Sequence, residues 1–276
     1  MIYEITLSVG KEVVNPVKEK IPLSVAIITK NEAQNLPACL QSVSFAGQIV
    51  LVDSGSSDGT ADIARGFGCQ VYNEPWRGFG AQKQFAIDQC THRWVLLLDA
   101  DERIPAVTAS AIKDIVDLDS DEAAGYSFPR KNFFQGRWIK HLWGGDRVVR
   151  LFRNNLGQMT TARVHEAVEV EGPVKALDVP LEHYTESNLS KLLMKIDHYS
   201  TLGAREAFDE GKRASVWTAT FLAFLAFFQS YFLKSGFLDG VQGLTLSVAE
   251  SVNKFFKYAK LSERGRKGKI DPQDHP

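Results

Sequence analysis

Asp99 and Asp101 are two carboxylates one residue apart, and they directly follow the apolar run 94–98. A run this apolar is typical of a central strand that is covered on both faces. Carboxylates at the end of such a strand are costly to bury unless a partner compensates their charge. A divalent cation is such a partner, because hard cations take oxygen ligands and often share them with a substrate phosphate. The pair therefore indicates a metal-assisted site, although helix caps and turns at strand ends use the same spacing.

The chain around this run alternates between strand-like and helix-like segments. We expect strands at 23–29, 48–53, 70–73 and 94–99, and helices at 35–43, 60–67, 82–90 and 105–116. Alternation at this spacing predicts βαβ units and a parallel sheet. The fold class is therefore expected to be α/β, with helices on both faces of a mostly parallel sheet.

Polar residues end two further strands of this predicted sheet. The first strand ends in Thr29-Lys30-Asn31-Glu32, and the second ends in Asp53 and a Gly/Ser-rich loop up to Thr60. Ligands of parallel sheets bind outside the carboxyl ends of the strands. Neither a P-loop sequence nor a Gly-x-Gly-x-x-Gly sequence follows the first strand, which argues against P-loop and dinucleotide-binding enzymes. Acidic strand ends are poor phosphate sites alone, but a cation makes them good ones.

In the second half of the chain, the regular alternation of strand-like and helix-like segments stops. Short strand-like pieces at 126–128, 148–152, 164 and 168–170 suggest an antiparallel extension where an acceptor binds. Apolar residues at helical spacing then predict a long helix at 188–210, and 236–243 is expected to be a loop before a last amphipathic helix.

Residues 214–233 carry no charge and many aromatic side chains, and Arg213 and Lys234 flank them. Their length is near the roughly 20 residues that a membrane span needs. Three readings stay open: a hairpin lying in the membrane interface, a transmembrane span, and a buried helix of a soluble domain or dimer interface. Basic residues beside these apolar aromatics fit the anionic cytoplasmic leaflet.

Composition narrows the function classes. The 276 residues have a formal net charge of −1, which argues against a general nucleic-acid binder. The three cysteines are widely spaced and are expected to be reduced rather than paired in a disulfide or bound to zinc. No signal peptide is expected within residues 1–15, which are polar and include Glu4, Lys11 and Glu12.

Three motifs together resemble family 2 glycosyltransferases of the GT-A fold. They are Val-Ala-Ile-Ile-Thr-Lys-Asn-Glu (25–32), Ile-Val-Leu-Val-Asp-Ser-Gly-Ser-Ser-Asp-Gly-Thr (49–60) and Leu-Leu-Leu-Asp-Ala-Asp-Glu (96–102). Later pieces at 146–153, 164–166 and 236–240 are most similar to the lipopolysaccharide inner-core β-1,4-glucosyltransferase subfamily. We expect an N-terminal extension at 1–20, which the resemblance does not explain, a GT-A domain at 21–185, and a helical, membrane-associated region with a basic tail at 186–276.

The resemblance also implies roles for the strand-end residues. Thr29, Asn31 and Glu32 would line the nucleoside pocket, and Asp53 would accept a hydrogen bond from the uracil imide N–H. Asp101 of this Asp-x-Asp motif would bind Mg²⁺ or Mn²⁺, and Asp99 would contact the ribose or the metal. Lys83 would neutralise the diphosphate, or it is a solvated helix lysine.

Inversion at the anomeric carbon requires a general base on the acceptor side. We expect Glu166 to be this base, with Asp146 as the second candidate. His165 is either a metal ligand or a strand residue. The three arginines of the 146–153 piece either contact phosphate groups or are solvated; they are Arg147, Arg150 and Arg153.

The expected function is transfer of a hexose, most simply glucose, from a UDP-sugar to an inner-core heptose of a lipid A-linked acceptor. The enzyme is expected to be cytoplasmic and peripheral on the inner face of the cytoplasmic membrane. Three alternatives remain: a glycosyltransferase for another cell-envelope or lipid-linked glycan, a sugar nucleotidyltransferase, and a non-catalytic membrane-associated binding protein. The oligomeric state, the sugar and the acceptor hydroxyl are left open.

Overall fold

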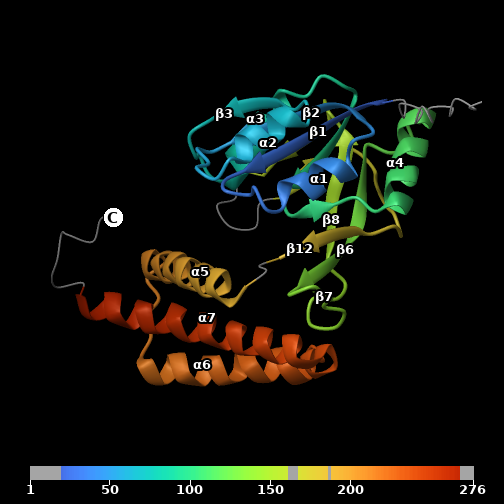
Figure 1. The fold of residues 1–276 in the computed structure, drawn as a ribbon. Helices are drawn as coiled ribbons and strands as arrows, with labels where there is room; N and C mark the ends of the chain where they lie inside the picture. Colours follow the sequence, from blue (N-terminus) through green and yellow to red (C-terminus); the bar gives the residue numbers. More distant parts are fainter. Residues whose placement is uncertain (1–19, 161–166, 186–187, 268–276) are drawn as a thin grey trace, which may run out of the picture.

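The computed structural model of the chain describes residues 20–160, 167–185 and 188–267. A sheet flanked by helices extends to Tyr184, and a layer of helices begins at Leu189 (Figure 1).

The first half of the sheet is parallel and is centred on β1 (Ile21–Thr29). Its neighbours are β2 (Ala46–Asp53) and β4 (Trp94–Asp99), and β3 (Gln70–Asn73) lies outside β2. The helices between these strands are α1 (Leu36–Ser42), α2 (Thr60–Gly66), α3 (Phe79–Asp88) and α4 (Ala106–Leu118). The register aligns Thr29 with Asp53 and Ile28 with Asp99, so three strand ends meet at one edge.

Both faces of these strands are buried, which explains why they read as continuous apolar runs. On one face, Leu23, Val25 and Ile27 of β1 pack in a large core with residues of α1, α2 and α4. On the other face, Ala26 and Ile28 pack in a second core with residues of α3. The predicted α/β class with helices on both faces is confirmed.

The second half of the sheet is mainly antiparallel, as expected. β8 (Arg147–Arg153) pairs antiparallel with β4 and with β6 (Gly125–Phe134), and β12 (Leu181–Tyr184) pairs parallel with β6. Shorter strands complete this half: β5 (Glu102–Arg103), β7 (Arg137–Trp138), β11 (Val174–Ala176), and the separate pair β9 (Gly157–Met159) and β10 (Val168–Val170). β8 and the long strand β6 therefore lie between β4, at the edge of the parallel half, and β12.

The helical layer contains α5 (Leu189–Asp209), α6 (Val216–Phe228) and α7 (Gly240–Lys267). A π-helical turn (Gln229–Leu233) extends α6, and a 3-10 turn (Gly236–Asp239) leads directly into α7. α7 packs between α5 and α6 (Figure 1).

The loop expected at 236–243 is wrong, because this segment is helical. A Cβ on Gly243 would lie 1.9 Å from the carbonyl oxygen of Gly236. The glycines therefore permit a close approach of two helical turns.

Asp239 attaches the helical layer to the sheet. Its buried carboxylate accepts hydrogen bonds from the backbone N–H groups of Lys140, His141 and Leu142. Beside this contact, Leu246 of α7 packs in a small core with apolar residues of the sheet domain, namely Phe134, Ile139 and Leu142. The layer is thus held by a buried polar contact and an apolar one.

Candidate active site

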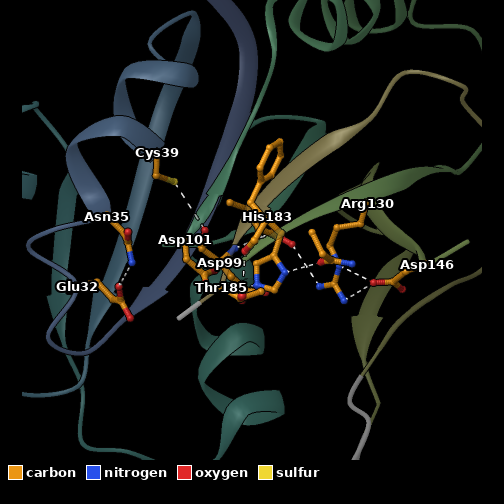
Figure 2. A network of polar contacts seen from close by, with 12 residues as sticks. Glu32, Asn35, Cys39, Asp99, Asp101, Arg130, Asp146, His183 and Thr185 are labelled. Carbon is orange, nitrogen blue, oxygen red and sulfur yellow. Dashed lines mark hydrogen bonds and ion pairs between the residues drawn. The ribbon is translucent and has the colours of Figure 1, made fainter. Parts of the chain in front are cut away.

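Asp101 lies just beyond the end of β4 and faces His183 of β12. The Oδ2 atom of Asp101 is 3.3 Å from Nε2 of His183, and Nδ1 of His183 is 2.7 Å from the amide oxygen of Asn132 (Figure 2). Burial alone would lower the pKa of His183, but the hydrogen bond and the charge of Asp101 outweigh it, so this pKa is raised. Two strands that are far apart in the sequence therefore bring an imidazole to the Asp-x-Asp motif.

Asp99 has different surroundings, although it is only one residue away. Its Oδ1 atom is 2.9 Å from Nζ of Lys83, and its Oδ2 atom is 2.7 Å from a guanidinium nitrogen of Arg150. The same nitrogen of Arg150 is 2.7 Å from Oε1 of Glu102, whose other oxygen accepts the backbone N–H of Asp99. Both carboxylates are thus fixed by a shared arginine.

These contacts hold Asp99 in its ionised form. Burial alone would raise the pKa of Asp99, but the charges of Arg150 and Lys83 lower it well below its ordinary value. Lys83 is buried, so it is not a solvated helix lysine. Both alternatives for Asp99, ribose contact and metal contact, remain predictions, and two cations already contact this carboxylate.

Two loops at the ends of β1 and β2, where a nucleoside is expected, bind each other. The Asn31 amide oxygen accepts the backbone N–H of Ser57, and the Asn31 N–H donates to the Ser56 hydroxyl. The carboxylate of Asp53 accepts hydrogen bonds from the N–H groups of Gly55 and Ser56 and from the Ser56 hydroxyl. Asn31 and Asp53 therefore order the loops where a nucleoside is expected to bind.

Two other predicted nucleoside residues differ in their contacts. Thr29 is buried, and its hydroxyl makes no hydrogen bond within the described part of the chain. Glu32 accepts a hydrogen bond from the side chain of Asn35 (Figure 2). Burial raises the pKa of Glu32, the Asn35 hydrogen bond opposes this, and the charge of Asp101 adds to the rise. Glu32 is thus close enough to the Asp-x-Asp motif to feel its charge.

Of the two candidates for the general base, Asp146 lies within the described residues and Glu166 does not. Asp146 forms an ion pair with Arg130, whose NH2 and Nε nitrogens lie 2.6 and 2.7 Å from its Oδ2 atom (Figure 2). Arg130 is also 3.6 Å from Glu102, so Asp146 is linked to the charges behind Asp99. Glu166 and His165 lie outside the described residues, so their roles stay predictions.

The arginines of β8 contact protein groups. Arg150 is buried between the carboxylates of Asp99 and Glu102. Arg153 is buried over the Trp94 ring, and Arg147 donates to the carbonyl oxygens of Ser127 and Leu177. Arg150 and Arg153 are therefore buried rather than solvated, whereas Arg147 is exposed.

A cavity of about 550 Å³ adjoins this site and separates the sheet from the helical layer. The sheet domain contributes Arg130, Asn132, Asp146 and His183 to its lining, and α5 and α7 contribute the facing wall. His183 therefore touches both Asp101 and the cavity. A molecule in the cavity would approach the Asp-x-Asp motif from the side away from the nucleoside loops.

The residues at this junction suit a divalent cation. Among the described residues, no group of three or more His, Cys, Asp and Glu side chains is placed to hold a metal. Asp101 and His183 could supply two ligands to the ion. The remaining coordination positions would be filled by phosphate oxygens and water, as is usual for Mg²⁺. The Asp101 carboxylate suits Mg²⁺ and Mn²⁺ alike, the two ions expected for this residue.

Sequence reasoning missed His183, Asn132 and Arg130. They lie on β12 and β6, where no periodic pattern singled them out, and only the pairing of these strands brings them to the motif. Glu102 was within reach of sequence reasoning, because it directly follows Asp101 in the quoted motif.

Residues 24–166 match the family model described as Glycosyl transferase family 2. The chain is 32% identical over 253 residues to the lipopolysaccharide core biosynthesis glycosyltransferase LpsC of Rhizobium meliloti (strain 1021), covering 89% of this chain and 93% of that protein. It is 28% identical over 259 residues to an uncharacterized glycosyltransferase, RC0292, of Rickettsia conorii, covering 90% and 92% of the two chains. A solved structure of the mannosyltransferase PcManGT from Pyrobaculum calidifontis, in complex with GDP-Man and Mn²⁺, aligns at 16% identity and a TM-score of 0.49, covering 88% and 87% of the two chains.

Proposed function

Because the chain belongs to glycosyltransferase family 2 and has the GT-A fold, we propose that it is an inverting hexosyltransferase acting on lipopolysaccharide. The donor is a UDP-sugar, most simply UDP-glucose, and the acceptor is an inner-core heptose linked to lipid A. The observation that carries the proposal is the position of the Asp101–His183 pair between the nucleoside loops and the cavity. The similarity to LpsC supports the lipopolysaccharide acceptor.

The donor is expected to bind with its nucleoside at the strand ends of β1 and β2. Thr29, with its unpaired buried hydroxyl, and Asp53 are the groups proposed to recognise the base. Asp101 and His183 would hold Mg²⁺ or Mn²⁺, which supplies positive charge against the charge that builds on the departing UDP. Lys83 and Arg150 hold Asp99 in place behind this site.

Attack on the anomeric carbon requires a base that takes the proton of the acceptor hydroxyl. Glu166 remains our first candidate for this base. Asp146 is the second, and its ion pair with Arg130 favours a positioning role at the cavity wall. We expect Glu166→Gln to abolish transfer while UDP binding persists; transfer at the native rate would remove Glu166 as the base.

We also propose that the enzyme works on the inner face of the cytoplasmic membrane. Val216–Leu233 has the length and composition of a helix that could cross a membrane, and 17% of this stretch is buried. Most of its aromatic side chains are exposed and its ends are basic, as an interfacial helix requires. The low burial argues against the reading as a buried helix within one chain.

A panel of UDP-sugars with a heptosylated lipid A acceptor, with and without Mn²⁺, tests the proposal. We expect release of UDP and transfer that depends on the metal and on the acceptor. Release of pyrophosphate would instead indicate a nucleotidyltransferase, and no UDP binding with Mn²⁺ would indicate a non-catalytic protein.

The matched variant for this experiment is Asp101→Ala. Loss of one of two metal ligands is expected to abolish transfer and to remove the Mn²⁺ dependence of UDP binding measured by calorimetry. Native transfer by Asp101→Ala would overturn the metal assignment.

A further inference from the structure

The cavity beside the Asp-x-Asp motif has a wall made by the helical layer. Residues of α5 and of α7 line it at the same spacing, one, four, five and eight, which places each set along one helix face. The α5 set is Leu192, Lys195, Ile196 and Tyr199, and the α7 set is Leu246, Ala249, Glu250 and Asn253. The cavity volume of about 550 Å³ lies within the usual range of small-molecule sites, roughly 300–1,000 Å³.

The α7 face carries polar atoms that the fold itself does not use. The side-chain oxygen of Asn253 is buried and has no hydrogen-bond partner among the described residues. Glu250, one turn earlier on the same face, makes no hydrogen bond or ion pair within the described ranges of the chain. Leaving a buried polar oxygen without a hydrogen bond is costly, and Asn is a weak helix former. A ligand that donates a hydrogen bond to the Asn253 oxygen would offset this cost.

The other side chains of the cavity suit a sugar. Trp143 and Tyr199 offer aromatic surface for the apolar faces of sugar rings, and Leu246 and Ala249 add apolar floor. Carboxylate and amide oxygens, such as those of Glu250 and Asn253, accept hydrogen bonds from hydroxyl groups. The opposite wall contains His183, which contacts the proposed metal ligand Asp101.

We propose that α5 and α7 form the acceptor-binding wall of the active site, and that Glu250 and Asn253 bind hydroxyl groups of the acceptor saccharide. The reacting sugar lies at the His183 end, and the neighbouring saccharide unit lies along α7. This inference deepens the proposed function and rests on it, because it assigns the acceptor side of the same site. The helical layer therefore selects the acceptor in addition to attaching the enzyme to the membrane.

The test uses the full-length protein and a deacylated, heptose-containing core oligosaccharide as the probe. Asn253→Ala and Ala249→Trp are compared with wild type; the first removes a hydrogen-bonding group and the second fills the cavity. We expect at least a tenfold rise in the KM for the oligosaccharide. UDP binding in Mn²⁺ and slow hydrolysis of the UDP-sugar by water should stay within twofold of wild type.

Lys254→Ala is the matched control, because Lys254 is exposed on α7 beside Asn253 and does not line the cavity. Glu250→Gln keeps the size of the side chain and should raise the KM less than Asn253→Ala. Unchanged oligosaccharide KM in both Asn253→Ala and Ala249→Trp would overturn the inference.

A direct binding measurement separates this inference from the proposed function. If wild type transfers no sugar from any UDP-sugar, the proposed function fails, and oligosaccharide binding is then followed by ligand-detected NMR. Binding that Ala249→Trp abolishes would still support a saccharide site on α7. Absence of binding, or binding that Ala249→Trp leaves unchanged, would overturn it.

Discussion

Asp99 and Asp101 illustrate how neighbouring residues of one motif acquire separate roles. Asp99 ends β4 inside the sheet, where two cations and the Glu102 carboxylate surround it. Asp101 lies past the strand end, where His183 and the cavity are its neighbours. Asp99 therefore contributes to the shape and charge balance of the motif, and Asp101 is the residue proposed to bind the cation.

Arg150 is the residue on which this charge balance depends. Arg150→Met would leave the buried carboxylate of Glu102 and the half-buried carboxylate of Asp99 without their shared cation. Removing one partner of a buried ion pair typically costs about 3–5 kcal/mol, and we expect the free energy of unfolding at pH 7 to fall by this amount. Urea denaturation measures it, with Arg147→Met as the control on the same strand, because Arg147 is exposed and, among the described residues, donates only to backbone carbonyls.

The same substitution predicts a pH dependence. The pKa of Asp99 is lowered in the folded protein, so its contribution to stability is present above the unfolded pKa of about 3.9 and is lost as the pH falls toward the folded pKa. We therefore expect the stability difference between wild type and Arg150→Met to narrow as the pH is lowered from about 4 toward 2. A difference that widens over this range would contradict the ionised state of Asp99.

The junction between the sheet and the helices depends on the short element that contains Asp239. Asp239→Ala would leave three buried or half-buried backbone N–H groups without their acceptor. Hydrogen bonds to a charged group contribute about 1.5–3 kcal/mol each and are not additive, so we expect a loss of about 2–4 kcal/mol in urea denaturation. Asp239→Asn keeps one acceptor oxygen and should lose less. Asp209→Ala, at an exposed carboxylate on α5, is expected to be neutral.

One face of helix α6 packs against the rest of the protein, and the other face is exposed. Its small residues Ala219 and Ala223 are buried, and the Ser251 hydroxyl of α7 donates to the Ala223 carbonyl. Aromatic side chains at helical spacing are exposed on the other side, beginning with Trp217, which is 85% exposed, and Phe221, which is 61% exposed. An apolar face of this kind, flanked by Arg213 and Lys234, fits an anionic membrane surface.

We therefore predict that the protein binds vesicles through α6. Fully burying a Phe side chain contributes about 1.5–3 kcal/mol, so Trp217→Ser combined with Phe221→Ser should weaken vesicle binding at least tenfold. Co-sedimentation with phosphatidylethanolamine vesicles, with and without phosphatidylglycerol, measures this. Leu118→Ser is the matched control, because Leu118 is 76% exposed but lies on α4 of the sheet domain. Loss of a dimer in place of vesicle binding would indicate that a second copy covers this face.

The elements also explain which parts of the site the sequence could predict. The strand ends of the parallel half follow short apolar runs, so Asp53, Asp99 and Asp101 could be located from local patterns. His183 and Asn132 depend on the pairing of β12 with β6, which local patterns do not fix. The glycines around 240 were misread because their close contacts with the preceding turn are tertiary.

At the scale of the whole molecule, the active site and the exposed face of α6 lie on opposite sides of α7. α7 lines the cavity with one face. With another face it packs against α6, which lies on the side of α7 away from α5 (Figure 1). A helix with its side chains is about 10–12 Å across, so these two layers separate the cavity from a membrane under α6 by roughly 20 Å. A sugar joined to a lipid through a few saccharide units can cover this distance while its acyl chains stay in the bilayer.

This arrangement predicts a rate advantage for a membrane-bound acceptor. Attachment through α6 confines the enzyme to the surface that holds the lipid-linked acceptor, which raises the effective concentration of one for the other. We expect wild type to have a kcat/KM at least tenfold higher for heptosylated lipid A in vesicles than for its deacylated counterpart in solution. Trp217→Ser combined with Phe221→Ser should remove this advantage and leave the kinetics with the deacylated acceptor within twofold of wild type, because neither residue lines the cavity. An equal loss with both acceptors would mean that α6 supports the active site directly, and an undiminished advantage would mean that another surface contacts the membrane.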